Sequence, residues 1–158
     1  MLVRQGCDAR NLHRQIMTWA EGMKVNRDLL NVGQGAAESP PADYVRWQGW
    51  VLTAFLNALW QLLHATNLEE AVVDTVMRGG DTDTNAAICG AILGAVHGRD
   101  AVPDQWVDSL LNCRPAVGQP NVRRPRPECF WPVDALELAE RLLVFDQRDM
   151  PTNQMKEY

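Results

Sequence analysis

The sequence predicts an all-α fold built as a bundle of helices. Apolar residues recur at helical spacing in several separate segments, and no segment shows the strict alternation typical of a half-buried strand. Glycine and proline separate these segments, and small polar residues precede several of them, as at helix starts. With 158 residues and 46% apolar content, the chain is large enough for a core, and we expect a single domain over residues 1–158.

A first helix is predicted over residues 8–23, with Asp8 as its N-terminal cap. Its apolar face is expected to consist of Leu12, Ile16, Trp19 and Ala20. A loop is expected to follow through the glycines at 33–35 and the prolines at 39–41, because these residues interrupt regular structure.

The longest helical pattern covers residues 44–65. Its stretch from residue 50 to residue 63 carries no charge, which predicts burial on most sides. Thr53, Asn57 and Gln61 recur at a spacing of four and form a narrow polar line along this helix. A line of this kind usually faces solvent, and we expect Gln61 to do so.

Two further helices follow, separated by a glycine pair. The segment Thr66-Asn67-Leu68-Glu69 predicts a capping box for a helix that Gly79 ends. The next helix, over residues 81–97, begins with an acidic turn and continues as an uncharged run rich in alanine and glycine. Gly90 and Gly94 share one of its faces, so another backbone is expected to approach closely there. The run is too short to cross a bilayer and indicates the central helix of a bundle.

The start of this helix carries the clearest chemical signal. Asp81-Thr82-Asp83-Thr84 follows Gly79-Gly80 and places two carboxylates and two hydroxyls within four residues. Such oxygen donors suit Mg²⁺, Mn²⁺ or Ca²⁺ rather than Zn²⁺. The alternative is an N-terminal cap, for which one Asp is enough. The excess of donors favours a metal site, with the first turn carrying both carboxylates into the interior, where a cation would offset their burial.

Two other interpretations of the Asp pair are excluded. A calcium loop of the EF-hand type beginning at Asp81 requires glycine at its sixth position and glutamate at its twelfth, where this chain has Ala86 and Ile92. An Asp-x-Asp of the haloacid-dehalogenase type follows a buried strand, whereas the residues before this pair are predicted to be helical.

The string GGDTDTNAAICGAILGA, which begins at Gly79, resembles the C-terminal signature of the ADP-ribosylglycohydrolases. This family of all-α hydrolases includes dinitrogenase-reductase-activating glycohydrolase and the ADP-ribosyl-arginine and ADP-ribosyl-serine hydrolases. The likeness extends upstream to Gly49-Trp50-Val51 and downstream to residues 103–111, well over half the chain. It implies an orthogonal helical bundle of which only the C-terminal portion is present.

The resemblance also implies a centre of two Mg²⁺ ions, with Mn²⁺ as an alternative. The implied metal ligands are Asp81, Asp83 and Thr84, and Asp83 would serve catalysis by contacting both ions. Trp50, Thr53 and Asn57 would line the substrate cleft, although core packing is the alternative for Trp50. The family's N-terminal Thr-Asp-Asp motif has no counterpart in the sequence.

The expected activity is Mg²⁺-dependent hydrolysis of the glycosidic bond between ADP-ribose and a modified protein side chain or small molecule. The alternative is a catalytically inactive truncated remnant or a partner-binding helical module. A chain that holds half of a fold would expose part of its core and self-associate.

Composition limits the partners. A net charge of −5 and a pI near 5.1 argue against nucleic acid as the main partner, and no membrane segment or secretory signal is expected. The four cysteines show no metal or disulfide spacing, which favours reduced thiols and a cytoplasmic location.

Toward the C-terminus, a helix is predicted over residues 103–111 and an extended, proline-rich arm over 114–132. A final amphipathic helix over 133–145 is expected to bury Leu136, Ala139, Leu142 and Leu143, and the helix before the arm is expected to bury Trp106, Leu110 and Leu111. His64 and His97 are expected at helix ends, near the C-terminal dipole.

Overall fold

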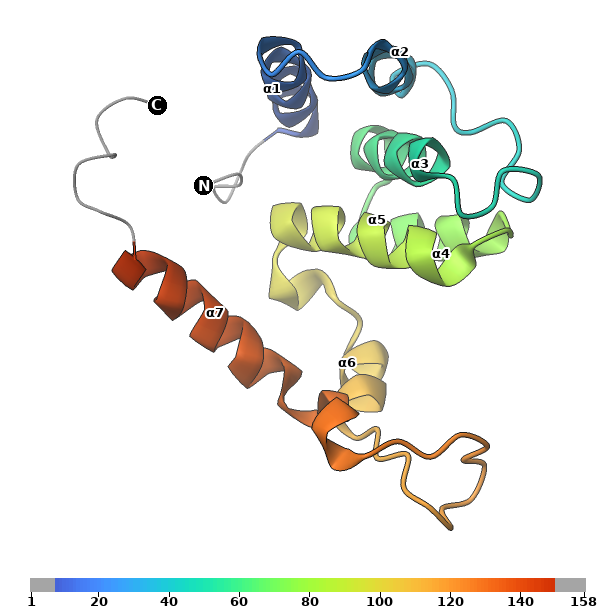
Figure 1. Cartoon of the computed structure of the whole chain (residues 1–158), viewed down its shortest axis with the longest axis vertical. Helices are drawn as coiled ribbons and strands as arrows, with labels where there is room; N and C mark the ends of the chain where they lie inside the picture. Colours follow the sequence, from blue (N-terminus) through green and yellow to red (C-terminus); the bar gives the residue numbers. More distant parts are fainter. Residues whose placement is uncertain (1–7, 150–158) are drawn as a thin grey trace. The chain divides into compact units, whose positions relative to one another are not determined.

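The computed structural model describes residues 8–149, with side chains to residue 142. That part of the chain contains seven α-helices, three short 3-10 helices and no strand (Figure 1), which confirms the all-α prediction. The chain divides into two compact units, Met1–Pro103 and Asp104–Tyr158, which are described separately. The expectation of a single domain stays a prediction.

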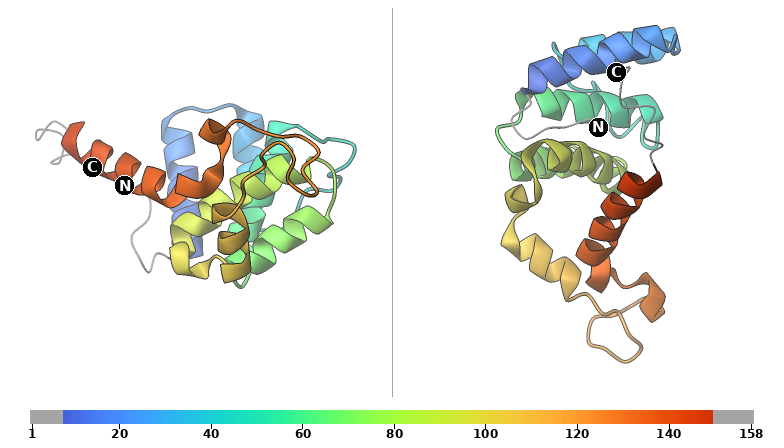
Figure 2. Two further views of the ribbon diagram at one scale, coloured as in Figure 1. Left: turned by 90° about the horizontal axis from the view of Figure 1, so that it is seen from below. Right: turned by 90° about the vertical axis from the view of Figure 1, so that its left-hand side faces the viewer.

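From residue 8 onward, the first unit contains five α-helices and one 3-10 helix. Their bounds are α1 Ala9–Gly22, α2 Arg27–Gly35, α3 Val51–His64, α4 Leu68–Met77, α5 Thr82–His97 and η1 Arg99–Ala101. α5 packs against α3 and α4, whereas α1 and α2 pack on α3 and on each other. α3 therefore lies in the middle, between the α1–α2 layer and the α4–α5 layer (Figures 1 and 2).

The core of this unit lies where α3, α4 and α5 meet. Its largest fully buried side chains are Asn57 and Leu59 of α3, Thr75 of α4, and Cys89 and Leu93 of α5. Burial of a leucine side chain contributes roughly 1.5–3 kcal/mol, so these contacts hold the three helices together. The buried face of α5 follows Asn85, Cys89 and Leu93, at a spacing of four. The start of α5 is thereby fixed on a packed platform.

The first layer differs in part from the sequence expectation. Asp8 caps α1 by accepting a hydrogen bond from the Asn11 backbone N–H, as predicted. Met17 is buried on α1, whereas Trp19 is 40% exposed, so the predicted apolar face is wrong at Trp19. The predicted loop at 33–35 is also wrong, because these residues belong to α2. A Cβ atom at Gly33 would lie 2.7 Å from Met17 Sδ, so glycine is selected there by close packing.

α3 begins later than the sequence pattern suggests. Residues 44–49 form turns, Trp50 is extended, and Gly49 has a φ of 74°, which ends any continuous helix before Val51. Gln61 is only 3% exposed, so the expectation that it faces solvent is wrong. Its side-chain amide donates a hydrogen bond to Asp74 of α4, which removes the penalty of burying a polar group.

The α4–α5 pair confirms the predicted boundaries and corrects two details. Gly79 follows α4 with a φ of 79°, as a helix-ending glycine should. The cap of α4 is Asn67 rather than Thr66, because Asn67 Oδ1 accepts a hydrogen bond from the Glu70 backbone N–H. Cβ atoms at Gly90 and Gly94 would meet side chains of α4 at 3.7 and 3.8 Å, so an ordinary side-chain contact replaces the expected close backbone approach.

One side of α5 is not covered by α3 or α4. Its exposed residues there are Ala87, Ile88, Ala91 and Ala95. In the described residues, α5 is therefore packed on one side by α3 and α4, whereas a central helix would be covered on all sides. His64 and His97 lie in the last turns of α3 and α5, as expected.

The second unit is smaller. Its elements are α6 Asp104–Leu111, η2 Glu128–Phe130, η3 Pro132–Asp134 and α7 Ala135–Asp149. The arm between α6 and η2 is free of helix, as predicted. Leu110 and Leu142 are 50% and 64% exposed and Ala139 is also exposed, so the predicted burial of these three residues is wrong. The Leu143 side chain lies outside the described residues. Within the described range, no helix combines the length and apolarity needed to cross a bilayer.

Candidate metal centre

The acidic segment begins at a tight turn between α4 and α5. Gly79 and Gly80 adopt φ values of 79° and 74°, which favour glycine. A Cβ atom at Gly80 would lie 2.0 Å from the Tyr44 carbonyl oxygen, so no larger residue fits without displacing backbone. The turn is thereby pressed against residues 44–45, and this contact fixes where α5 starts.

The side chain of Asp81 affects the ionisation of Asp83. Asp81 occupies the N-cap position of α5, yet within the described residues its side chain makes no capping hydrogen bond. The pKa of Asp83 lies below its ordinary value, chiefly because of a hydrogen bond with the Asp81 side chain and then because of the backbone N–H groups of Asp83 and Thr84. Neighbouring carboxylates repel each other, and a bound cation would remove the repulsion.

The pair lies at the surface, which corrects the expectation that the first turn carries both carboxylates inward. Asp83 and Thr84 are exposed and Asp81 is half-buried. The reason for Asp83 is rotational: the face of α5 that packs on α3 and α4 runs through Asn85, and a residue two positions earlier points to the opposite side of the helix. Asp81 precedes Asn85 by four residues and lies above the same face, at the open end of the helix. In the described part of the chain, no group of three or more His, Cys, Asp or Glu residues is arranged to hold a metal ion. The pair thus offers only part of a coordination shell.

An aromatic and cationic surface adjoins the acidic pair. A Cβ atom at Gly49 would lie 3.8 Å from Asp81 Oδ2, which places the loop before α3 beside this carboxylate. The rings of Trp47 and Trp50 lie 5.4 Å apart, tilted by 47°, and both residues are 47% exposed. The Arg46 guanidinium lies 5.1 Å from the centre of the Trp47 ring. Sequence reasoning identified Trp50 but missed Trp47 and Arg46, although a second tryptophan flanking Gly49 was a usable signal.

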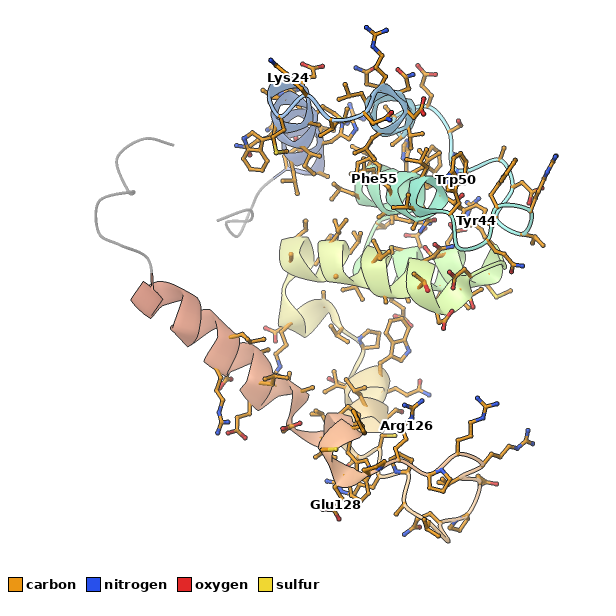
Figure 3. The ribbon with its side chains drawn as sticks, viewed as in Figure 1. Lys24, Tyr44, Trp50, Phe55, Arg126 and Glu128 are labelled. Carbon is orange, nitrogen blue, oxygen red and sulfur yellow. The ribbon has the colours of Figure 1, made fainter. Side chains whose placement is uncertain are left out.

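A buried hydrogen-bond chain holds this loop in place. Tyr44 Oη donates to Asn57 Oδ1 at 2.8 Å, Asn57 Nδ2 donates to Thr75 Oγ1 at 3.0 Å, and Thr75 Oγ1 donates to the Ala71 carbonyl at 2.8 Å. Burial raises the pKa of Tyr44 to about 12, so the phenol stays protonated and can donate. Figure 3 shows Tyr44 and Trp50 at the same end of α3. These three hydrogen bonds therefore connect the loop, α3 and α4 through groups that are shielded from water.

A second set of contacts fixes the end of α4. Asp74 accepts hydrogen bonds from Gln61 and from Arg78 Nε, the latter at 2.6 Å. The hydrogen bond to Asp74 is the main reason that the pKa of Arg78 is raised, so its positive charge is secure. The Arg78 guanidinium also lies 5.5 Å from the centre of the Tyr44 ring. Both ends of the glycine turn are thus anchored.

The predicted site residues fall into two groups. Asp81, Asp83 and Thr84 lie together at the start of α5, with Trp50 on the adjoining loop. Thr53 is 6% exposed and Asn57 is fully buried, and the Asn57 side chain supports Tyr44 and Thr75. Direct contact of these two residues with a substrate stays a prediction, as do the ligand roles of the first group.

Comparison with known proteins identifies the family. A model of the ADP-ribosylglycohydrolase family matches residues 1–149. This chain belongs to that family.

Several relatives share segments of the chain. A putative ADP-ribosyl glycohydrolase, L543, from Acanthamoeba polyphaga mimivirus is 39% identical over 61 residues, 36% of this chain and 18% of the relative. The ADP-ribosylarginine hydrolase Tri1 of Serratia proteamaculans is 29% identical over 83 residues, 52% of the chain and 23% of the relative. Human ADP-ribosylhydrolase ARH3 is 44% identical over 43 residues, 27% of the chain and 12% of the relative.

The chain therefore covers less than a quarter of the length of each of these relatives. No solved structure matches the chain significantly.

Proposed function

We propose that this chain supplies Asp81, Asp83 and Thr84 to a magnesium centre that hydrolyses the glycosidic bond between ADP-ribose and a protein side chain or small molecule. The observation that carries the proposal is the carboxyl pair at the start of α5, whose N-cap residue makes no capping hydrogen bond within the described residues. The relatives named as ADP-ribosylarginine hydrolase and ADP-ribosylhydrolase support the same class of substrate.

The donor set suits the ion. Carboxylate and hydroxyl oxygens are hard ligands that Mg²⁺ accepts, and Mn²⁺ accepts them as well. When bound, Mg²⁺ would orient the ribose hydroxyls and lower the pKa of a bound water. The chain's own contribution is negative charge: cleavage at the anomeric carbon builds oxocarbenium-like positive charge, which the carboxylates of Asp81 and Asp83 would stabilise. Within this scheme Asp83, as the more exposed of the two, is the catalytic carboxylate.

The loop before α3 is the proposed binding surface for the nucleotide part. The exposed face of Trp50 would stack on the adenine or ribose, since aromatic stacking gains free energy with any base. Arg46 would pair with the diphosphate, which guanidinium groups bind well. The loop that carries both residues lies beside Asp81 at Gly49, and one ligand is proposed to contact both surfaces.

The test measures Mg²⁺ and ADP-ribose binding by the chain itself. Mg²⁺ at ten times its dissociation constant should stabilise the fold by about 1.4 kcal/mol, a rise of roughly 3–5 °C in Tm. Asp83→Asn should abolish this rise and weaken ADP-ribose binding in calorimetry. Asp100→Asn, which removes the same charge from an exposed position in η1, is the matched control and should behave as the unchanged chain.

A rise in Tm that is equal in Asp83→Asn and Asp100→Asn would refute the metal assignment. Hydrolysis is then tested with peptides that carry ADP-ribosyl-arginine or ADP-ribosyl-serine, with Asp83→Asn as the inactive reference. Release of ADP-ribose that persists in this variant would refute the catalytic role.

A second candidate is a helical module that completes its site with another polypeptide. The exposed side of α5, with Ile88 at 38% exposure among three alanines, favours this possibility. A module of this kind should self-associate, which sedimentation measures. Alternatively, it should bind ADP-ribose only after a partner is added, which calorimetry measures. We infer a cytoplasmic location in either case, where the free thiols of Cys89, Cys113 and Cys129 stay reduced.

A further inference from the structure

The first unit contains a cavity on the side of α3 that faces α1. Its volume is about 520 Å³, within the range of small-molecule sites. Four of its lining residues come from α1, namely Arg10, His13, Arg14 and Met17, and two come from the end of α3, namely Leu63 and His64. We call this space the α1 cavity. Because α1 and α3 pack within one compact unit, its walls are fixed relative to each other.

The charge of the α1 cavity is opposite to that of the chain. Arg10 and Arg14 are four residues apart on α1, so their guanidinium groups share one side of the helix. No Asp or Glu lines the cavity in the described part of the chain, and neither arginine forms an ion pair there. Arg14 Nη1 donates to Asn11 Oδ1 at 2.8 Å, a neutral partner that leaves the charge of Arg14 uncompensated. Two permanent positive charges on a chain with a net charge of −5 can therefore bind an external anion.

Both histidines of the α1 cavity are oriented by backbone contacts. His13 Nε2 donates to the Gly33 carbonyl at 2.9 Å, and His64 Nδ1 donates to the Trp60 carbonyl at 3.0 Å. The His64 ring also stacks on Trp60, with 3.7 Å between ring centres. In each ring one nitrogen is engaged by a backbone carbonyl, so the other remains for a ligand.

The floor of the α1 cavity is apolar. Met17 is buried, and its sulfur lies against the backbone of Gly33 in α2. Leu63 is half-buried beside it on α3. An inorganic ion would leave this surface without contact, whereas an anion with an apolar body would cover it and gain roughly 25 cal/mol per Å² buried.

We propose that the α1 cavity binds a small organic phosphate, with Arg10 and Arg14 holding the phosphate group and Met17 and Leu63 contacting the apolar body. Guanidinium groups match phosphate oxygens with paired hydrogen bonds, which favours phosphate over a single point charge. His13 and His64 supply further ring nitrogens at the rim.

The α1 cavity is separate from the acidic pair. His64 ends α3, whereas the loop beside Asp81 precedes Val51 at the other end of the same helix. At 1.5 Å per residue these ends are about 20 Å apart, so one small ligand cannot occupy both places. The proposal therefore goes beyond the proposed hydrolysis and does not depend on it.

The test uses phenyl phosphate as the probe, titrated into the isotope-labelled chain and followed by NMR. We expect saturable binding at millimolar concentrations, with shifts at Arg10, Arg14, Met17 and Leu63. The variant Arg10→Gln with Arg14→Gln should weaken binding by at least about tenfold. The control, Arg123→Gln with Arg124→Gln, removes the same charge from exposed positions in the second unit and should leave binding unchanged.

Further probes resolve the class of ligand. Inorganic phosphate should bind more weakly than phenyl phosphate, and Met17→Ala should reduce only the binding of phenyl phosphate. Benzoate should bind more weakly than phenyl phosphate, because a carboxylate offers fewer oxygens.

Equal binding of phenyl phosphate and inorganic phosphate would overturn the role of the apolar floor, and equal binding of benzoate would overturn the preference for phosphate. Equal losses in the two arginine variants, or no saturation, would overturn the site. Since Arg10 and Arg14 are exposed, both variants should keep the helical circular dichroism of the parent, and the single variants Arg10→Gln and Arg14→Gln repeat the test if the double variant unfolds.

Discussion

Substitution of Gly80 by alanine tests whether close packing positions the acidic turn. Gly80 has a φ of 74°, and a Cβ atom there would lie 2.0 Å from the Tyr44 carbonyl oxygen and 2.8 Å from its carbon. The neighbour is backbone, which cannot move aside like the end of a flexible side chain. Gly80→Ala must therefore shift the turn, the loop or both.

The expected loss follows from two contributions. A left-handed conformation costs a residue with a Cβ atom about 1–2 kcal/mol. Overpacking against a fixed neighbour adds about 1–3 kcal/mol. Together they lower the free energy of unfolding by about 2–5 kcal/mol, which corresponds to roughly 5–15 °C in Tm for a chain of this length.

The assay is urea and thermal unfolding followed by circular dichroism. Gly90→Ala is the matched control, because it adds the same methyl group where the nearest atom, Val72 Cγ2, lies at an ordinary 3.7 Å. This control should gain about 0.5–1 kcal/mol, since glycine in a helix interior is unfavourable relative to alanine. A Gly80→Ala variant as stable as the parent would show that the contact with Tyr44 does not fix the turn.

The remaining predictions concern the buried polar groups. Tyr44→Phe should lower stability by about 1–3 kcal/mol, because it leaves Asn57 Oδ1 buried without its donor; urea unfolding measures this, and an unchanged midpoint would contradict it. The pKa of Tyr44 is raised from 10.0 to about 12, so its stabilisation should be complete below pH 10 and be lost as pH rises to 12. Unfolding across this window should show a loss of about 2 kcal/mol that Tyr44→Phe removes; an identical pH profile in both proteins would argue against it. Asn57→Ala should cost about 2–4 kcal/mol, whereas Asn85→Ala should cost less than half as much, because Asn85 Nδ2 has no hydrogen-bond partner among the described residues; thermal unfolding of the two variants decides the order.

Local signals predicted most of the helices. Asp8 before α1, Gly79 after α4 and the polar start of α5 act through neighbours within one helical turn, so the sequence alone reveals them. The sequence alone also reveals the carboxyl pair of Asp81 and Asp83, because a candidate metal site of this kind is identified by residue type and spacing.

Contacts between distant segments decided the rest. The polar line on α3 is indistinguishable in sequence from a solvent-facing one, but Asn57 and Gln61 find partners on the loop and on α4. In the sequence, Gly33 predicts a loop, whereas in the structure it lies in α2 and Met17 of α1 packs against it. Burial of polar groups and tight glycine contacts depend on which helices pack together. The periodicity within one helix does not indicate which other helices it contacts.

The candidate site shows the same division. Sequence alone determined the oxygen donors at the start of α5 and the all-α class, since both follow from residue types over a few turns. Only the tertiary structure placed the loop at Gly49 beside Asp81, left Asp83 at the surface and brought α1 against the end of α3 to form a cationic cavity. Those features arise where separate helices pack, and the free energy of packing is a property of the assembled fold.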